Sequence, residues 1–197
     1  HPLTTLLKEK GYKIVLASNS PRRQELLKGL GINYKVKTLP NLDESFPDNL
    51  QPEEIPLYIA RNTAGAYCPV IDKSELIITA DTIVWLDGEV LGKPENEADA
   101  KNMLRKLSGK THKVITGVCL TTWDWQKSFT AVTEVKFSEL TDDEISFYVE
   151  TYKPMDKAGA YGVQEWIGYV AVESITGSYY NVMGLPIHKL YKELSGL

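Results

Sequence analysis

The chain has 197 residues, of which 43% are hydrophobic and 24% charged, and its formal net charge is −4. Residues 1–197 are therefore expected to form one globular domain with a substantial core, which two lobes could share. The mildly acidic balance argues against partners that need broad basic surfaces, so we expect no binding of nucleic acid or of an anionic membrane. A small anionic ligand in a local basic pocket stays compatible with this charge.

Taken in chain order, the apolar residues alternate between the patterns of strands and helices. Strands are expected over residues 13–18, 33–38, 76–80, 83–90, 112–123, 128–137 and 167–174, and helices over 21–30, 53–67, 96–108, 141–150 and 186–194. Asp87-Gly88 is typical of a hairpin turn, and the stretch Thr141–Glu144 of a capping box that opens a helix. There are too few strand-helix-strand units for a fully parallel sheet, so the expected class is α/β with a mixed sheet.

The two cysteines, Cys68 and Cys119, lie in no CxxC or Cys/His metal spacing. This spacing predicts neither a disulfide framework nor a zinc site, and it favours a reducing cytoplasm. No apolar run approaches the roughly 20 residues that span a bilayer. The amino-terminal stretch also lacks the long apolar segment of a signal peptide, so we expect a cytoplasmic protein.

The stretch SNSPRR, from Ser18 to Arg23, joins the first expected strand to a helix. Ser20 is a good cap and Pro21 suits the first helical position, so the free N–H groups of this helix start can bind an anion such as phosphate. Arg22 and Arg23 add fork-shaped donors for phosphate oxygens, although adjacent residues lie about 100° apart around a helix. A capped surface helix with two solvated arginines is the alternative, and the residues leave both readings open.

Asp81 directly follows the apolar run LIITA. A carboxylate at the carboxyl end of a strand lies where α/β proteins place their ligands, and there it could activate water or hold a metal. The alternative is that Asp81 caps a turn with Thr82.

Charged residues elsewhere in the chain could complete such a site. Lys93, in LGKP, follows the expected hairpin and could reach a phosphate as a point charge. The loop acids Asp43 and Glu44 could supply oxygen ligands to Mg²⁺ beside phosphates. Solvated loop side chains are the alternative in both places.

The stretch AGAYGVQ ends in the amide of Gln164. Small residues let a backbone approach a base closely, and an amide both donates and accepts hydrogen bonds. A surface loop that tolerates glycine is the alternative. The chain contains no serine-histidine-aspartate spacing, phosphate-loop lysine motif or HExxH, so any chemistry is expected to rest on carboxylates and a metal.

In this order, LASNSPRRQELL, the Asp-Glu pair, TADTIV, LGKP, TGV, KAGAYGVQ and GSYYNVMGLP resemble the Maf family over residues 14–186. The resemblance implies a nucleoside triphosphate pyrophosphatase that cleaves between the α- and β-phosphates with a divalent metal, Mg²⁺ or Mn²⁺. It also implies an elongated mixed sheet flanked by helices, with two lobes around a cleft, related to the inosine triphosphatase fold. A homodimer would be in keeping with the family.

The resemblance also implies roles for individual residues, and AGAYxxQ is similar to the branch that acts on dTTP and UTP. The implied roles are Asp81 as the proton acceptor, Arg22, Thr82 and Gln164 in substrate selectivity, Ser18, Arg23 and Lys93 at the phosphates, and Glu44 with Asp81 at the metal.

The chain departs from the family pattern at two places. Thr63 stands where the family commonly has a lysine, and Glu165-Trp166 follow the glutamine where a glycine is frequent. Two alternatives therefore accompany the dTTP/UTP reading: a pyrophosphatase for 7-methyl-GTP or another modified nucleotide, and a nucleotide-binding regulator of septum formation with little catalysis.

Overall fold

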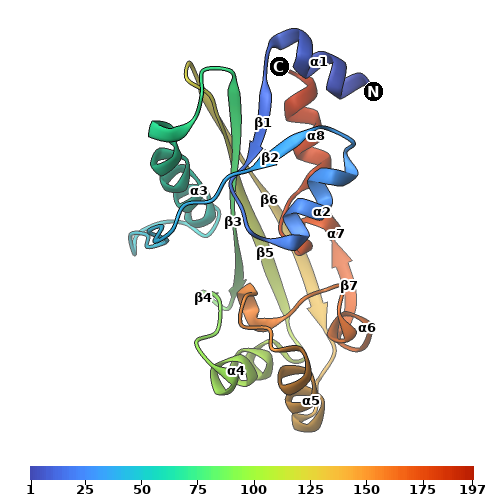
Figure 1. Cartoon of the computed structure of the whole chain (residues 1–197). Coiled ribbons are helices and arrows are strands. Elements are labelled where there is room, and N and C mark those ends of the chain that lie inside the picture. The colour runs from blue at the N-terminus through green and yellow to red at the C-terminus, as the bar shows by residue number, and fades with distance from the viewer. The chain divides into compact units, whose positions relative to one another are not determined.

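The computed structural model describes all residues from 1 to 197 (Figure 1). The helices are α1 (Pro2–Lys10), α2 (Pro21–Gly29), α3 (Glu54–Tyr67), α4 (Glu97–Leu107), α5 (Asp142–Tyr152), α6 (Trp166–Ala171), α7 (Tyr179–Met183) and α8 (Ile187–Ser195), with 3₁₀ turns at Cys68–Val70 and Ala158–Ala160. The strands are β1 (Lys13–Leu16), β2 (Tyr34–Val36), β3 (Glu75–Leu86), β4 (Glu89–Leu91), β5 (Thr111–Thr121), β6 (Gln126–Phe137) and β7 (Val172–Thr176).

The strands form one seven-stranded sheet in the order β2-β1-β3-β5-β6-β7, with β4 paired to β3. β1 runs parallel to β2 and β3, whereas β4 is antiparallel to β3 and β7 is antiparallel to β6. The expected α/β class with a mixed sheet is confirmed.

Contacts divide the chain into two compact units. The first unit contains His1–Asp81, Thr116–Ala131 and Gly184–Leu197, and the second contains Thr82–Ile115 and Val132–Met183. Strands β3, β5 and β6 each contribute residues to both units.

In the first unit, α3 packs closely against strands through small residues. Ala60 is fully buried beside Cys119 of β5, and its carbonyl accepts a hydrogen bond of 2.8 Å from the hydroxyl of Thr79. At Gly117 a Cβ atom would lie 2.4 Å from the backbone nitrogen of Leu57. The glycine of the TGV motif therefore stands where any side chain would collide with the helix backbone.

Residues 2–10, for which the sequence predicted no element, form α1. Leu3 and Leu7 lie one turn apart and are both buried, and Gly11 ends the helix with a left-handed backbone at φ 79°. The helix packs against α8, beside which it runs in the first unit (Figure 1). Tertiary packing therefore stabilises a helix whose sequence signal is short.

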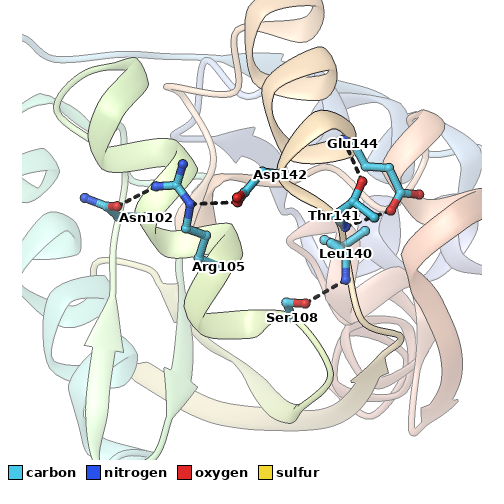
Figure 2. A network of polar contacts seen from close by, with 7 residues as sticks. All are labelled: Asn102, Arg105, Ser108, Leu140, Thr141, Asp142 and Glu144. Carbon is cyan, nitrogen blue, oxygen red and sulfur yellow. Dashed lines mark hydrogen bonds and ion pairs between the residues drawn. The ribbon is translucent and has the colours of Figure 1, made fainter.

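In the second unit, polar side chains join the ends of α4 and α5 (Figure 2). Arg105 of α4 donates to Asp142 at 3.2 Å and to Asn102 at 2.8 Å. The predicted capping box is confirmed: the N–H of Glu144 donates to the Thr141 hydroxyl at 3.1 Å, and the Glu144 carboxylate accepts from the N–H of Thr141 at 2.8 Å.

Two predicted strands are corrected by the structure. The strand expected to end before Asp81 continues through it to Leu86, and Asp87 and Gly88 then form the predicted hairpin turn with φ 49° and 80°. The strand expected over 167–174 is instead the helix α6 followed by β7. An apolar run of this length fits either element, and tertiary packing decided between them.

Candidate active site

A short turn leads from β1 into α2 (Figure 1), and α2 has the capped start that SNSPRR predicts. The hydroxyl of Ser20 accepts a hydrogen bond of 3.3 Å from the N–H of Arg23, and Pro21 occupies the first helical position. The hydroxyl of Ser18 accepts from the N–H of Ser20 at 3.1 Å and keeps its own proton to donate. The positive end of the helix dipole and the N–H groups of the first turn make this terminus suitable for an anion.

Gln24, for which the sequence predicted no role, stabilises this turn. The side-chain amide of Gln24 donates to the carbonyl of Ser18 at 3.0 Å, and the hydroxyl of Tyr34 donates to the carbonyl of Gln24 at the same distance. These bonds join the turn to α2, and α2 to β2. No sequence spacing signals such contacts, since they depend on strand pairing.

Arg23, in the first unit, interacts electrostatically with three other charged residues of that unit. Its Nε donates to the carbonyl of Gly184 at 2.7 Å, which orients the guanidinium. Burial lowers the pKa of Arg23, the charges of Asp81 and Glu44 act to raise it, and that of Arg22 acts to lower it further. Arginine nevertheless stays charged in proteins. The structure thus brings Arg22, Glu44 and Asp81 within electrostatic reach of Arg23.

Asp81 lies inside β3 and not in a loop after it. The last pair between β1 and β3 joins Leu16 to Ile78, so Asp81 lies three residues beyond the carboxyl end of the paired part of β1. The chain leaves β1 there and enters the Ser18 turn, which explains why a residue in a strand lies near a helix start. Its side chain is half-buried.

The two loop acids have different environments. Asp43 accepts a hydrogen bond of 2.9 Å from the N–H of Ser45. Hydrogen bonding from the side chain of Ser45, and then this backbone bond, lowers the pKa of Asp43. Glu44 is exposed, and its charge acts on Arg23. Asp43 therefore interacts with its own loop through Ser45, whereas Glu44 interacts electrostatically with Arg23.

No group of three or more His, Cys, Asp or Glu side chains that could hold a metal occurs in residues 1–197. Mg²⁺ commonly binds to one or two carboxylates and completes its shell with water and substrate phosphates. Asp81 and Glu44 fit a cation that arrives with phosphates, and they do not fit a resident metal centre.

The second unit contains the other three predicted site residues. Thr82 is half-buried in β3. The hairpin pairs Leu91 with Val84 in antiparallel register, so the chain runs towards the Thr82 end of β3 as it reaches the exposed Lys93. The hairpin therefore returns the chain along the strand that contains Asp81.

Gln164 belongs to residues 158–165, here called the glutamine loop. The carbonyl of Gly92 accepts a hydrogen bond of 3.1 Å from the N–H of Gly159, so the loop lies beside the segment that contains Lys93. Residues 159–163 are buried, whereas Gln164 is exposed. Gln164 is therefore an exposed side chain that directly follows a buried segment of the loop.

Thr63 and Arg61 both lie on α3. Arg61 donates to the hydroxyl of Ser128 at 2.7 Å and 3.2 Å, so its guanidinium contacts β6. Arg61, two residues before Thr63, is therefore directed towards β6.

The chain is similar to known proteins over nearly its whole length. A family model described as "Maf-like protein" matches residues 13–197. A protein of Bacteroides fragilis named dTTP/UTP pyrophosphatase is 68% identical over 94% of this chain and 96% of its own length. A protein of Phocaeicola vulgatus with the same name is 67% identical over the same shares.

Among solved structures, the Ham1 protein of Staphylococcus aureus superposes with a TM-score of 0.53 at 15% identity. The match covers 93% of this chain and 98% of that protein. At this identity, the likeness shows a shared fold alone.

Proposed function

Because the chain belongs to the family of Maf-like proteins, we propose that it is a nucleoside triphosphate pyrophosphatase that hydrolyses dTTP and UTP. The products are the nucleoside monophosphate and pyrophosphate. The observation that carries the proposal is the charge arrangement of the first unit, in which Asp81, Glu44 and Arg22 all act on Arg23 beside a capped helix start.

In the proposed reaction, Asp81 accepts a proton from the water that attacks the α-phosphorus. Asp81 is half-buried, and its charge interacts with the guanidinium of Arg23. The bond between the α-phosphorus and the bridging oxygen breaks, and pyrophosphate takes the electron pair. Arg23 and the N–H groups of the α2 start stabilise the charge that develops on phosphate oxygens.

We propose that Glu44 and Asp81 hold a divalent cation, Mg²⁺ or Mn²⁺, which would neutralise phosphate charge. Ser18 and Lys93 are proposed to contact phosphate oxygens. Asp81 remains the base in this scheme, because a carboxylate that shares a cation can still hydrogen-bond to water.

Base recognition is proposed for Arg22, Thr82 and Gln164. Uracil and thymine present an N3–H donor between two carbonyl acceptors, and one amide can satisfy a donor and an acceptor together. The exposed amide of Gln164 on a buried loop suits this role.

No helix of the chain is long and apolar enough to cross a membrane. The two cysteines are both free thiols, which fits a reducing compartment, and we propose a cytoplasmic location without a nucleic-acid partner. Light scattering after size-exclusion chromatography would test the homodimer that the family resemblance implies.

The proposal predicts that Asp81→Asn lowers kcat for dTTP and UTP by about 10²–10⁴-fold, because the variant lacks the general base. Asp87→Asn is the matched control, since Asp87 lies in the exposed turn at the end of the same strand and asparagine suits that turn equally. Release of pyrophosphate is measured for both variants, beside their thermal unfolding. Near wild-type turnover by Asp81→Asn would overturn the assignment.

Hydrolysis in ¹⁸O-water identifies the bond that breaks. Attack on the α-phosphorus places the label in the monophosphate, whereas label in the pyrophosphate would contradict the mechanism.

A panel of dTTP, UTP, CTP, GTP and 7-methyl-GTP at equal concentration separates the two enzymatic readings. Binding of dTTP without release of pyrophosphate would favour the regulator.

A further inference from the structure

The glutamine loop has a constrained backbone. Ala160 adopts φ 61°, in the left-handed region that costs a non-glycine residue free energy, and it is fully buried. The preceding Gly159 is also left-handed, at φ 70°. Such a conformation persists only where surrounding contacts hold it, so the contacts on either side of Ala160 decide how the loop is placed.

One such contact follows Ala160 directly. The hydroxyl of Tyr161 lies 2.6 Å from Nε2 of His112 on β5, and both side chains are buried. Phe137 of β6 packs edge-on against both rings, with ring centroids 5.0 Å from His112 and 4.9 Å from Tyr161. Burial lowers the pKa of His112 to about 4 and raises the pKa of Tyr161, so both are neutral near pH 7. A neutral imidazole and a protonated phenol can form this bond in either direction.

A second contact holds the other end of the loop. The hydroxyl of Tyr148 on α5 accepts a hydrogen bond of 3.0 Å from the N–H of Gly162 and donates one of 2.5 Å to the Glu165 carboxylate. Burial and the bond to Glu165 raise the pKa of Tyr148, so its hydroxyl stays protonated and can donate. One phenol therefore bridges the residues that lie two before and one after Gln164.

These contacts leave Gln164 as the exposed position between two fixed points. Val163 is buried and Glu165 is held by Tyr148, so the backbone on both sides of Gln164 has little freedom. An amide discriminates between bases only when its oxygen and nitrogen have defined positions, because a freely turning amide satisfies uracil and cytosine equally well.

We propose that His112 and Tyr148 are positioning residues for base selection: they fix the glutamine loop so that Gln164 distinguishes the N3–H edge of uracil and thymine from the unprotonated N3 of cytosine. The inference rests on the proposed function, in which Gln164 contacts the base. Neither residue needs to touch the substrate. Removing either contact should therefore change the ranking of substrates more than the chemical step at Asp81.

The first test compares kcat and KM for dTTP, UTP and CTP in Tyr148→Phe and in His112→Leu. Tyr148→Phe removes the two hydrogen bonds of the Tyr148 hydroxyl, and His112→Leu removes the one to Tyr161. Each loss is expected to lower the ratio of kcat/KM for dTTP to that for CTP by about fivefold or more, mainly through KM. The ratio cancels any loss of folded enzyme, so a merely structural role would leave it unchanged.

Two further variants serve as controls. Tyr152→Phe removes a hydroxyl from the residue that stacks on Tyr148 in the same helix, at 5.1 Å between ring centroids, and it should keep the wild-type ratio. In His112→Gln the side-chain amide can reach the position of Nε2, so this variant should restore most of the discrimination that His112→Leu loses. An unchanged ratio in both Tyr148→Phe and His112→Leu would overturn the proposal.

The second test needs no activity. Amide hydrogen exchange of residues 158–165 is expected to be at least about tenfold faster in Tyr148→Phe, because the N–H of Gly162 loses its acceptor. Unchanged exchange would overturn the positioning role even if selectivity shifted. If the wild-type protein hydrolyses neither dTTP nor UTP, the proposed function and the base-selection role fall together. Exchange then still decides whether the two residues fix the loop.

Discussion

Arg23 shows how a residue acquires a role from its surroundings. Two adjacent arginines at a helix start oppose the helix dipole, which is unfavourable unless an anion or a carboxylate compensates. The structure supplies such compensation, since Asp81 and Glu44 act on Arg23 and the carbonyl of Gly184 holds its Nε. The unfavourable charge at this helix start is therefore compensated by groups from other parts of the fold.

His112 gives a prediction about pH at the same scale. Its pKa is lowered by burial from 6.5 to about 4, so between these values the unfolded chain binds a proton that the folded chain does not. Stability should therefore fall as the pH drops from about 6.5 to 4, by about 3 kcal/mol from this residue, since one pKa unit corresponds to about 1.4 kcal/mol.

Denaturant unfolding at several pH values measures this dependence. The His112→Gln variant removes the titrating ring and should show a flatter profile than the wild-type protein in the same range. Parallel profiles for the two proteins would contradict a neutral, buried His112, because the carboxylates that also titrate there are common to both.

At the scale of elements, the contact between α3 and β5 depends on a missing side chain. A Cβ atom at Gly117 would lie 2.4 Å from the nitrogen of Leu57 and 2.5 Å from the carbonyl carbon of Pro56. These are backbone atoms in the first turn of α3, so a rotamer change cannot relieve the clash. The helix would have to move away from the strand.

Gly117→Ala is therefore expected to lower the free energy of unfolding by about 1–3 kcal/mol or more, the usual cost of overpacking a core. Gly65→Ala is the matched control: it lies on α3 with no atom within 4 Å of an added Cβ, and alanine should raise helix stability by up to about 1 kcal/mol. Thermal unfolding of both variants measures the difference. Equal melting temperatures would mean that the helix does not rest on the strand at this point.

Elements also show where local patterns were reliable. The capping box at Thr141–Glu144 and the hairpin turn at Asp87-Gly88 were both predicted correctly. The hydrogen bonds of the box and the φ angles of the turn depend on neighbouring residues. The apolar run over 167–174 was assigned wrongly because its periodicity fits both a short helix and a strand. The helix α1 was not predicted at all, since its burial depends on α8 at the other end of the chain.

For the whole molecule, the net charge is −4, so we expect the proposed triphosphate substrate to be recognised by local cations and a metal and not by the overall field. A ligand that binds the folded chain stabilises it in proportion to the logarithm of its concentration over Kd. A UTP analogue with a methylene bridge between the α- and β-phosphates cannot be cleaved, so it reports binding by the intact protein.

With Mg²⁺ and the analogue at 100 times its Kd, the melting temperature should rise by about 5–10 °C, corresponding to roughly 2.7 kcal/mol. Excess chelator should remove most of this rise, because repulsion between the phosphates and the two carboxylates is then uncompensated. Uridine serves as the control without phosphate. An equal rise with uridine, or with the analogue in chelator, would contradict recognition through metal-bound phosphate.

The sequence alone was sufficient for the α/β class, the caps and turns, and the set of residues from Ser18 to Gln164 that carries the resemblance to the family. These features are local, or they recur in a fixed order along the chain. Only the tertiary structure showed that Arg23 interacts electrostatically with Asp81 and Glu44, and that Arg61 contacts β6. It also showed that Tyr148 and His112 form hydrogen bonds to the glutamine loop. These relations join residues far apart in sequence, and strand pairing and packing, which no local pattern encodes, bring them together.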